Sequence, residues 1–347
     1  MNLTARFGRG AVALAMVLAT SPAMAEGNEG SGSGRGSAEA LAITADNFEP
    51  TTTLDDRLPA NAPRALPPSA AMFATVSRSA DGSVTQSPAN ETVTRSLGAG
   101  SATAPAAPKS RAGNDPALGA RQVFGADDRV RISDTGQFPF RVFGYLQIEK
   151  QNGKFSGCSG TLIGPRTVLT AAHCLYDHEN GWRKRFVFVP GMKVMGDAPF
   201  GAYESESASI LSGYITNYQG YYGSVVPWDL GIVHLRERAG DVAGWLGIGH
   251  FPDLGPFTAN IIGYPGDKPE GTMWRASCEV AGDRIGEMTI GYDCDTFPGS
   301  SGSSVYDYDP DTKSRIVLGV NVAENPVENT AVRLNGAYFE WARSLIK

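Results

Sequence analysis

Residues 295–305 read DTFPGSSGSSV, and this run decides how the rest of the chain is interpreted. Ser301 stands in the pattern Gly-x-Ser-Gly between Gly299 and Gly302, and an apolar stretch follows. Glycines at these places permit a tight turn whose N–H groups point inward. A similar string, GSGSGRGS at 30–37, is typical of flexible chain. Serine and glycine content alone does not distinguish a catalytic serine from one in a flexible segment, so the surrounding sequence is needed.

A serine hydroxyl becomes a good nucleophile when a base takes its proton and a carboxylate orients that base. The candidate base is His173, one of four histidines, in TVLTAAHCL, where an apolar strand ends beside a cysteine. The candidate carboxylate is Asp229 in PWDLGIVHL, at the head of an apolar strand. Either residue alone is more often structural. Together with Ser301, in the order His–Asp–Ser, they predict a nucleophilic triad, with the N–H groups of Gly299 and Ser301 as the oxyanion hole.

The first 25 residues have the three parts of a secretory signal peptide. Arg6 and Arg9 precede an apolar run, residues 23–25 read AMA, and Glu26 is the expected first residue after cleavage. The run is too short to span a bilayer comfortably. We therefore expect a secreted protein, extracellular or periplasmic, with no membrane attachment after signal cleavage.

Composition divides the remaining chain near Arg121. All five Trp and all twelve Tyr follow it, and Phe48 and Phe73 are the two aromatic residues of 26–122. Such a chain buries too little apolar surface to offset an ordering cost of roughly 1–2 kcal/mol per residue. We expect 26–122 to be a low-complexity, mostly disordered pro-region and 123–347 to be the folded unit.

Four cysteines in an exported chain are expected to be oxidised, and they allow three pairings. The two pairs are equally spaced, which suggests the bridges Cys158–Cys174 and Cys278–Cys294, each worth roughly 3 kcal/mol in the chain-entropy account. No Cys-x-x-Cys pair occurs in the sequence, so a metal site is the weaker alternative. We expect no metal and no cofactor.

After Arg121, short apolar runs alternate with turns, as in an all-β barrel or sandwich. The expected strands are 141–150, 154–164, 185–189, 229–235, 259–264, 273–280, 314–322 and 330–334. One helix is expected at the end, capped by Asn335.

The net charge of −6 and the lack of a basic stripe argue against a nucleic-acid partner. The acidic run DYDPD at 307–311 has alternating oxygens, but Pro310 favours a hairpin turn over a calcium loop.

The motifs TAAHC, WDLGIVHL and GSSGS resemble the histidine, aspartate and serine motifs of the chymotrypsin-like serine proteases. The resemblance narrows to the bacterial glutamyl endopeptidases in GYPGDKPEGTMW (263–274), in residues 295–309, and in VFGADDRVRISDTGQFPFRVFGYLQI (123–148), which resembles a mature N-terminus. The closing NTAVRLNGAYFEWARSLI also fits. The likeness covers about 123–347.

The resemblance implies two antiparallel six-stranded β-barrels, at about 135–237 and 240–334, and a C-terminal helix at 336–346. His173 and Asp229 would come from the first barrel and Ser301 from the second. The implied reaction is peptide-bond hydrolysis through an acyl-enzyme on Ser301. The implied partners are protein or peptide substrates, and we expect a monomer.

The resemblance leaves the residue before the cleaved bond open between an acidic residue and the alternative of Arg or Lys. The branch often cuts after Glu, using a histidine whose place is taken here by Asn321, which cannot carry positive charge. Thr296 matches the pocket threonine, while Asp295 lies where trypsin-like enzymes keep the carboxylate that selects Arg or Lys. Ser300 replaces the aspartate that completes trypsin-type activation. We therefore expect activation by removal of the pro-region, with cleavage near residues 121–123.

Two other functions compete with this interpretation. An α/β-hydrolase esterase needs Gly-x-Ser-x-Gly and the order Ser–Asp–His, but Ser303 stands where the last glycine belongs and the order is reversed. A catalytically inactive binding protein with the protease fold usually lacks a triad residue, whereas this chain keeps all three.

Overall fold

The computed structural model describes residues 36–39, 41–44, 46–50, 67–99, 123–325 and 327–347. The predicted signal peptide, most of the GSGSGRGS string and residues 121 and 122 lie outside the described residues. No helix in the described part of the chain is long and apolar enough to cross a membrane.

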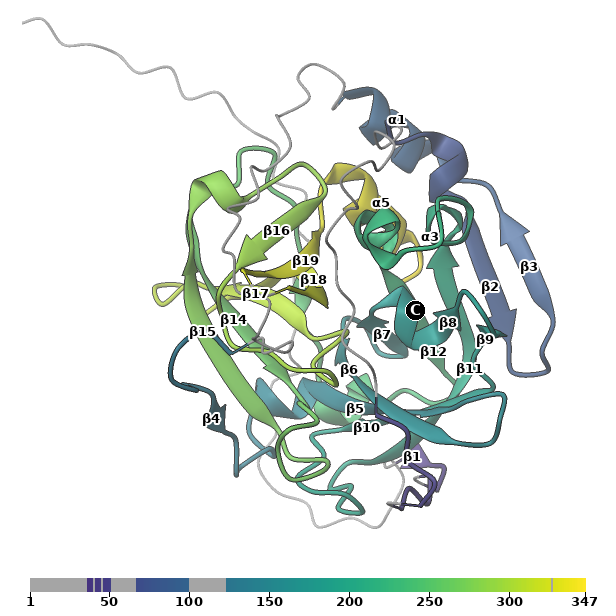
Figure 1. The fold of residues 1–347 in the computed structure, drawn as a ribbon, viewed down its shortest axis with the longest axis vertical. Helices are drawn as coiled ribbons and strands as arrows, with labels where there is room; N and C mark the ends of the chain where they lie inside the picture. Colours follow the sequence, from purple (N-terminus) through teal and green to yellow (C-terminus); the bar gives the residue numbers. More distant parts are fainter. Residues whose placement is uncertain (1–35, 40, 45, 51–66, 100–122, 326) are drawn as a thin grey trace, which may run out of the picture.

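Six strands between residues 143 and 235 form a closed antiparallel barrel (Figure 1). The ladder runs β10-β5-β6-β7-β12-β11, and β11 pairs again with β10 to close the ring. Its interior face carries buried apolar side chains such as Leu146, Val168 and Phe188. The strands are β5 (Phe143–Glu149), β6 (Phe155–Leu162), β7 (Thr167–Thr170), β10 (Arg185–Pro190), β11 (Gly201–Leu211) and β12 (Gly231–Leu235).

In the second half, six antiparallel strands run in the order β16-β19-β18-β17-β14-β15 within an eight-stranded sheet. The two short strands that complete the sheet are β4 (Val130–Arg131), beside β15, and β13 (Gly247–Ile248), which is parallel to β18. No ladder joins β15 to β16 among the described residues, so this sheet is a half-barrel. The bridge between Cys278 on β15 and Cys294, just after β16, ties the two edges together with 5.1 Å between their Cα atoms. The strands are β14 (Phe257–Gly263), β15 (Trp274–Val280), β16 (Thr289–Tyr292), β17 (Ser304–Tyr308), β18 (Arg315–Glu324) and β19 (Asn329–Arg333).

The predicted all-β fold and its C-terminal helix are confirmed. Helix α5 (Gly336–Ser344) begins where the Asn335 side chain accepts from the N–H groups of Ala337 and Tyr338. The acidic run at 307–311 lies in the hairpin turn between β17 and β18, where the Asp309 carboxylate accepts from the N–H groups of Asp311 and Thr312.

The expectation of disorder is wrong for residues 67–99. They form a 3-10 turn, a hairpin and a helix, and β2 pairs antiparallel with β11 at the side of the first barrel (Figure 1). Apolar residues are few here but well placed: Phe73 is 1% exposed and Val93 is fully buried. Average composition misses this arrangement because the barrel supplies most of the apolar surface. The elements are η1 (Ala70–Phe73), β2 (Thr75–Ser79), β3 (Val84–Ser87) and α1 (Glu91–Ala99).

Residues 36–50, where described, also lie on the first barrel. β1 (Gly36–Ser37) pairs parallel with the start of β11. Phe48 bridges to Phe155 on β6, and the carboxylate of Glu49 lies 2.8 Å from the ammonium of Lys150. The remaining elements are η2 (Phe140–Val142), α2 (Ala172–Leu175), β8 (Tyr176–Asp177), β9 (Gly181–Trp182), α3 (Ser212–Thr216), η3 (Tyr222–Ser224), η4 (Val226–Trp228), α4 (Gly240–Ala243) and η5 (Gly282–Arg284).

Candidate active site

His173 sits on α2, a single helical turn that follows β7 in the first barrel. The neighbouring Cys174 is bridged to Cys158 on β6, with 6.2 Å between their Cα atoms. The sequence-suggested pairing is therefore present, and it fixes the backbone that carries the histidine. The His173 side chain is buried, with the residue 7% exposed.

Asp229 contacts His173 twice. One carboxylate oxygen accepts from the His173 backbone N–H at 2.8 Å, and the other lies 2.6 Å from Nδ1 of the ring. An ionised carboxylate at Nδ1 keeps the proton on that nitrogen and leaves Nε2 as a proton acceptor. Asp229 is fully buried, so water does not compete for these contacts.

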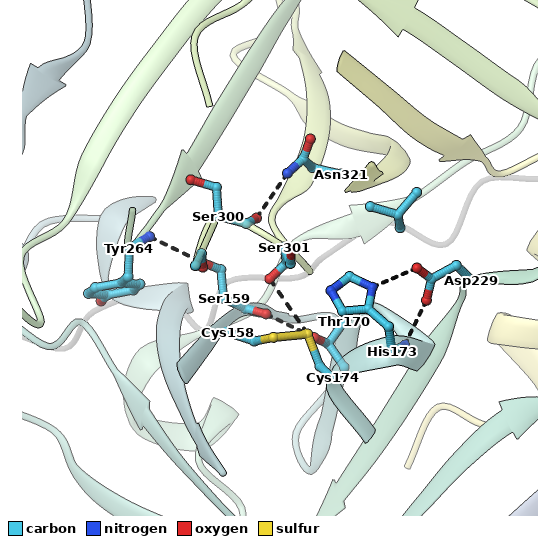
Figure 2. The surroundings of a disulfide bond; sticks show 12 residues. Cys158, Ser159, Thr170, His173, Cys174, Asp229, Tyr264, Ser300, Ser301 and Asn321 are labelled. Carbon is cyan, nitrogen blue, oxygen red and sulfur yellow. Dashed lines mark hydrogen bonds and ion pairs between the residues drawn. A yellow bond between two sulfur atoms is a disulfide. The ribbon is translucent and has the colours of Figure 1, made fainter. Parts of the chain in front are cut away.

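The free nitrogen of His173 faces the Ser301 loop (Figure 2). Nε2 is buried and has no hydrogen-bond partner among the described residues, and no hydrogen bond joins it to Ser301. Catalytic hydrogen bonds are often long without substrate and shorten when substrate binds. The arrangement can accept a proton from a serine hydroxyl that moves toward the ring.

Tyr222 is a residue of the site that sequence reasoning missed. Its hydroxyl contacts the Asp229 oxygen that faces the histidine ring, and it lies 3.0 Å from the carbonyl oxygen of Val322 on β18. Its ring stands edge-on to the His173 ring, with 6.0 Å between centroids. Tyr222 therefore connects the aspartate to the second sheet. No sequence signal distinguishes it from Tyr221 or Tyr218.

The Ser301 loop is held against β6 of the first barrel. The Ser301 carbonyl accepts from the N–H of Ser159 at 2.8 Å, and the Ser159 hydroxyl donates to the Gly299 carbonyl at 2.8 Å. The Ser301 carbonyl also lies 3.9 Å from the sulfur of Cys174. This is a van der Waals contact, because a bridged cysteine has no S–H to donate. These contacts hold the Ser301 loop beside the part of the first barrel that carries His173.

The two glycines of the loop cannot be replaced without strain. Gly299 has φ +105° and Gly302 has φ +86°, both in the left-handed region. A Cβ at Gly299 would lie 2.6 Å from the Tyr264 carbonyl oxygen. Within the described chain, the N–H groups of Gly299 and Ser301 donate no hydrogen bond to a protein acceptor.

Asn321 and Asp295 are occupied by the protein's own contacts. The Asn321 amide accepts from the Tyr292 hydroxyl and donates to the Ser300 carbonyl at 3.2 Å. The Asp295 carboxylate accepts from the backbone N–H groups of Phe124 at 2.7 Å and Asp128 at 3.1 Å. Burial raises the pKa of Asp295 above its usual range, although these two N–H groups act in the opposite direction. Asp295 therefore anchors the chain after residue 123.

Glu324 is a second residue that sequence reasoning missed. The Thr296 hydroxyl donates to its carboxylate at 3.1 Å, and Glu324 is 3% exposed. Burial raises the pKa of this carboxyl to about 7. The stretch LGVNVAE contains it three residues after Asn321, so its position in the strand was the available signal.

His173 also borders a cleft of about 320 Å³. Cys158, Cys174, Tyr176 and Tyr222 line it, and Glu49 and Pro50 of the N-terminal part reach its edge.

Cys158, His173 and Cys174 bring three ligand-type atoms within 4.8 Å of one another. The two sulfurs are bonded to each other, so neither is a thiolate that could bind a metal ion. This group is a structural support for the histidine.

A family of known proteins and several individual proteins are similar to this chain. The family described as a trypsin-like peptidase domain matches residues 158–311, which contain His173, Asp229 and Ser301. A glutamyl endopeptidase of Bacillus licheniformis is 33% identical over 189 residues, 54% of this chain and 55% of that protein. An extracellular metalloprotease of Bacillus subtilis is 30% identical over 203 residues, 57% of this chain and 62% of that protein.

The chain thus spans between one half and two thirds of the length of these curated relatives. A solved structure of a Glu endopeptidase in complex with MPD superposes with a TM-score of 0.56 and 27% identity. The superposition covers 64% of this chain and 98% of that one.

Proposed function

Because the chain belongs to the chymotrypsin-like serine proteases, in the branch of the glutamyl endopeptidases, we propose that it is a secreted endopeptidase whose nucleophile is Ser301. The observation that carries the proposal is the double contact between Asp229 and His173 beside the Ser301 loop. Most buried polar side-chain atoms in proteins have a hydrogen-bond partner. Here Nε2 has no partner among the described residues and faces the serine.

The proposed reaction begins when Nε2 of His173 takes the hydroxyl proton of Ser301. The serine oxygen then bonds to the peptide carbonyl carbon, and the carbonyl oxygen becomes an oxyanion held by the N–H groups of Gly299 and Ser301. The C–N bond breaks as His173 returns the proton to the leaving amine. Water then attacks the acyl-enzyme with the same base, which frees the carboxylic acid and Ser301.

The alternative of an inactive binding protein is less well supported. Its usual signature is a missing triad residue or a blocked oxyanion hole. Here Gly299 and Gly302 both have positive φ, and the two candidate N–H donors have no acceptor within the described chain.

For the residue before the cleaved bond, we infer a preference for Arg or Lys over Glu. Thr296, which the family resemblance assigns to the pocket, contacts the Glu324 carboxyl. A glutamate side chain bound there would bring two carboxyl groups together, which is unfavourable when both are ionised. Asn321 does not offset this, since its amide is already bonded to Tyr292 and Ser300. Arg129 is near, but it pairs with Asp127 and Asp267.

Secretion and maturation complete the proposal. The signal-like residues 1–25 and the two disulfides support export, and we propose cleavage near Arg121 to give a chain that begins near Val123. N-terminal sequencing of the secreted protein tests this, and a mature start near Glu26 would contradict it.

Digestion of a mixed peptide library by the secreted protein tests the function and the preference together. We expect internal cleavage after Arg and Lys, abolished by Ser301→Ala and kept by Ser277→Ala, an exposed serine on β15. Cleavage after Glu would overturn the inferred preference but not the endopeptidase. Digestion that survives Ser301→Ala would overturn the nucleophile.

A further inference from the structure

We propose that residues 67–99 stay bound to the protease domain after the maturation cleavage and form a permanent part of its first barrel. The inference rests on the proposed cleavage near Arg121, because it concerns what happens to the chain before the cut. A pro-segment held only by its covalent link would diffuse away once that link is broken. Residues 67–99 instead make core packing and strand-pairing contacts with the rest of the protein.

The segment inserts a ring into an aromatic cluster of the protease domain. Phe73 is 1% exposed and stands edge-on to Trp228, at 5.4 Å between ring centroids, and to Tyr338 of α5, at 4.8 Å. Trp228 is 5% exposed and Tyr338 is fully buried in this arrangement. Removing the segment would bring large apolar rings into water, which opposes its release.

The segment also extends the hydrogen-bonded ladder of β11. β2 pairs with residues 207–211 of β11, whose other side pairs with β12. Trp341 Nε1 donates to the Thr75 hydroxyl at 2.9 Å, and the Ser212 N–H donates to the Ala74 carbonyl at 2.8 Å. Without β2, β11 would present an open edge of unpaired backbone groups.

The same contacts reach the triad. Trp228, which packs on Phe73, directly precedes Asp229 in the chain. The Tyr338 hydroxyl donates to the Pro227 carbonyl at 2.5 Å. The segment therefore supports the backbone from Pro227 to Asp229, and with it the carboxylate that orients His173. We infer that its loss lowers kcat more than it changes KM, because Asp229 acts on the base.

The described residues on either side of 100–122 are held by separate contacts. On one side, α1 packs against α5 (Figure 1). On the other, the Phe124 N–H donates to the Asp295 carboxylate at 2.7 Å. One cleavage between these anchors breaks a covalent bond and removes none of the contacts described above. The matured enzyme is therefore a complex of two chains.

A controlled cut tests the retention directly. The full chain carries an inserted recognition sequence for a site-specific protease after residue 108, and the linker is cut after purification. We expect the fragment containing 67–99 to elute with the 123–347 region in size-exclusion chromatography and to give one complex in native mass spectrometry. Separate elution of the fragment from a folded protease domain would overturn the proposal.

A matched pair of variants tests the contacts that hold the fragment. In the cut protein, Phe73→Ala should raise the dissociation constant of the fragment at least about 100-fold, from loss of a buried aromatic side chain. Val84→Ala, on the exposed strand β3 of the same hairpin, should leave it within about twofold. Equal retention in both variants would overturn the role of Phe73.

Addition of a synthetic 67–99 peptide to the cut Phe73→Ala protein gives an activity readout. We expect the peptide to restore kcat with KM changed by less than about twofold. An increase of activity when the fragment leaves would show an inhibitor and would overturn the supporting role. If the fragment co-elutes but no hydrolysis occurs, the proposed function fails while the retention stands.

Discussion

The hydroxyl of Tyr222 contacts the same Asp229 oxygen that lies 2.6 Å from Nδ1 of His173. The carbonyl of Val322, on the second sheet, lies 3.0 Å from that hydroxyl. One tyrosine thus links the carboxylate beside His173 to the half of the molecule that carries Ser301. The contact assigns to Tyr222 a positioning role.

Tyr222→Phe removes that contact and keeps the ring. A hydrogen bond to a charged group contributes about 1.5–3 kcal/mol, so we expect kcat to fall roughly 10- to 100-fold with KM nearly unchanged. Tyr221→Phe is the matched control, because its hydroxyl bonds to Gln219. Steady-state kinetics of both variants check this, and equal losses of kcat would refute the positioning role.

The raised pKa of Glu324 makes stability depend on pH. Its value of about 7 in the folded protein exceeds the usual 4.5, so the folded state binds the proton more tightly. This contribution is fully present below pH 4.5 and is lost as the pH rises to about 7, a change of about 3 kcal/mol at most. Glu324→Gln should remove that loss, as urea unfolding at the two pH values would show. An unchanged difference between them would refute it.

The same carboxyl should control substrate choice. Above pH 7 Glu324 is ionised, so the ratio of kcat/KM for an Arg substrate to that for a matched Gln substrate should rise through this range. Taking the ratio cancels the ionisation of the catalytic base. Glu324→Gln should flatten the profile, and a ratio that stays pH-dependent in the variant would exclude Glu324 as its source.

The two disulfides should differ in what they support. Replacing Cys278 and Cys294 by serine opens the seam of the second sheet and should cost about 3 kcal/mol of stability with little change in kcat. Replacing Cys158 and Cys174 should lower kcat as well, because that bridge fixes the backbone of His173. Thermal unfolding and kinetics at a temperature where both remain folded separate the two effects.

Sequence patterns predicted the β strands well where apolar residues concentrate. The strand expected at 185–189 is β10, and the one at 273–280 is β15. β11 was missed because GAYESESASIL is rich in serine and glutamate, although its length lets it pair with four other strands. A strand with such partners is stabilised by its neighbours rather than by its own composition.

The site shows the same division. Local motifs predicted His173 and Asp229 as site residues, and the two side chains are in contact in the structure. Tyr222 and Glu324 act through contacts between distant segments, which no local pattern encodes. The folding of 67–99 was also hidden, because Phe73 is buried by rings from Trp228 and Tyr338 far along the chain.

The most direct test of the central claim is labelling of the secreted protein with a fluorophosphonate, followed by peptide mapping. A serine activated by the His173–Asp229 pair should react once per chain, and the label should map to Ser301. Asp229→Asn should slow labelling strongly, since it disturbs the proton position on His173. A folded protein that takes up no label, or one labelled equally after Ser301→Ala, would contradict the account.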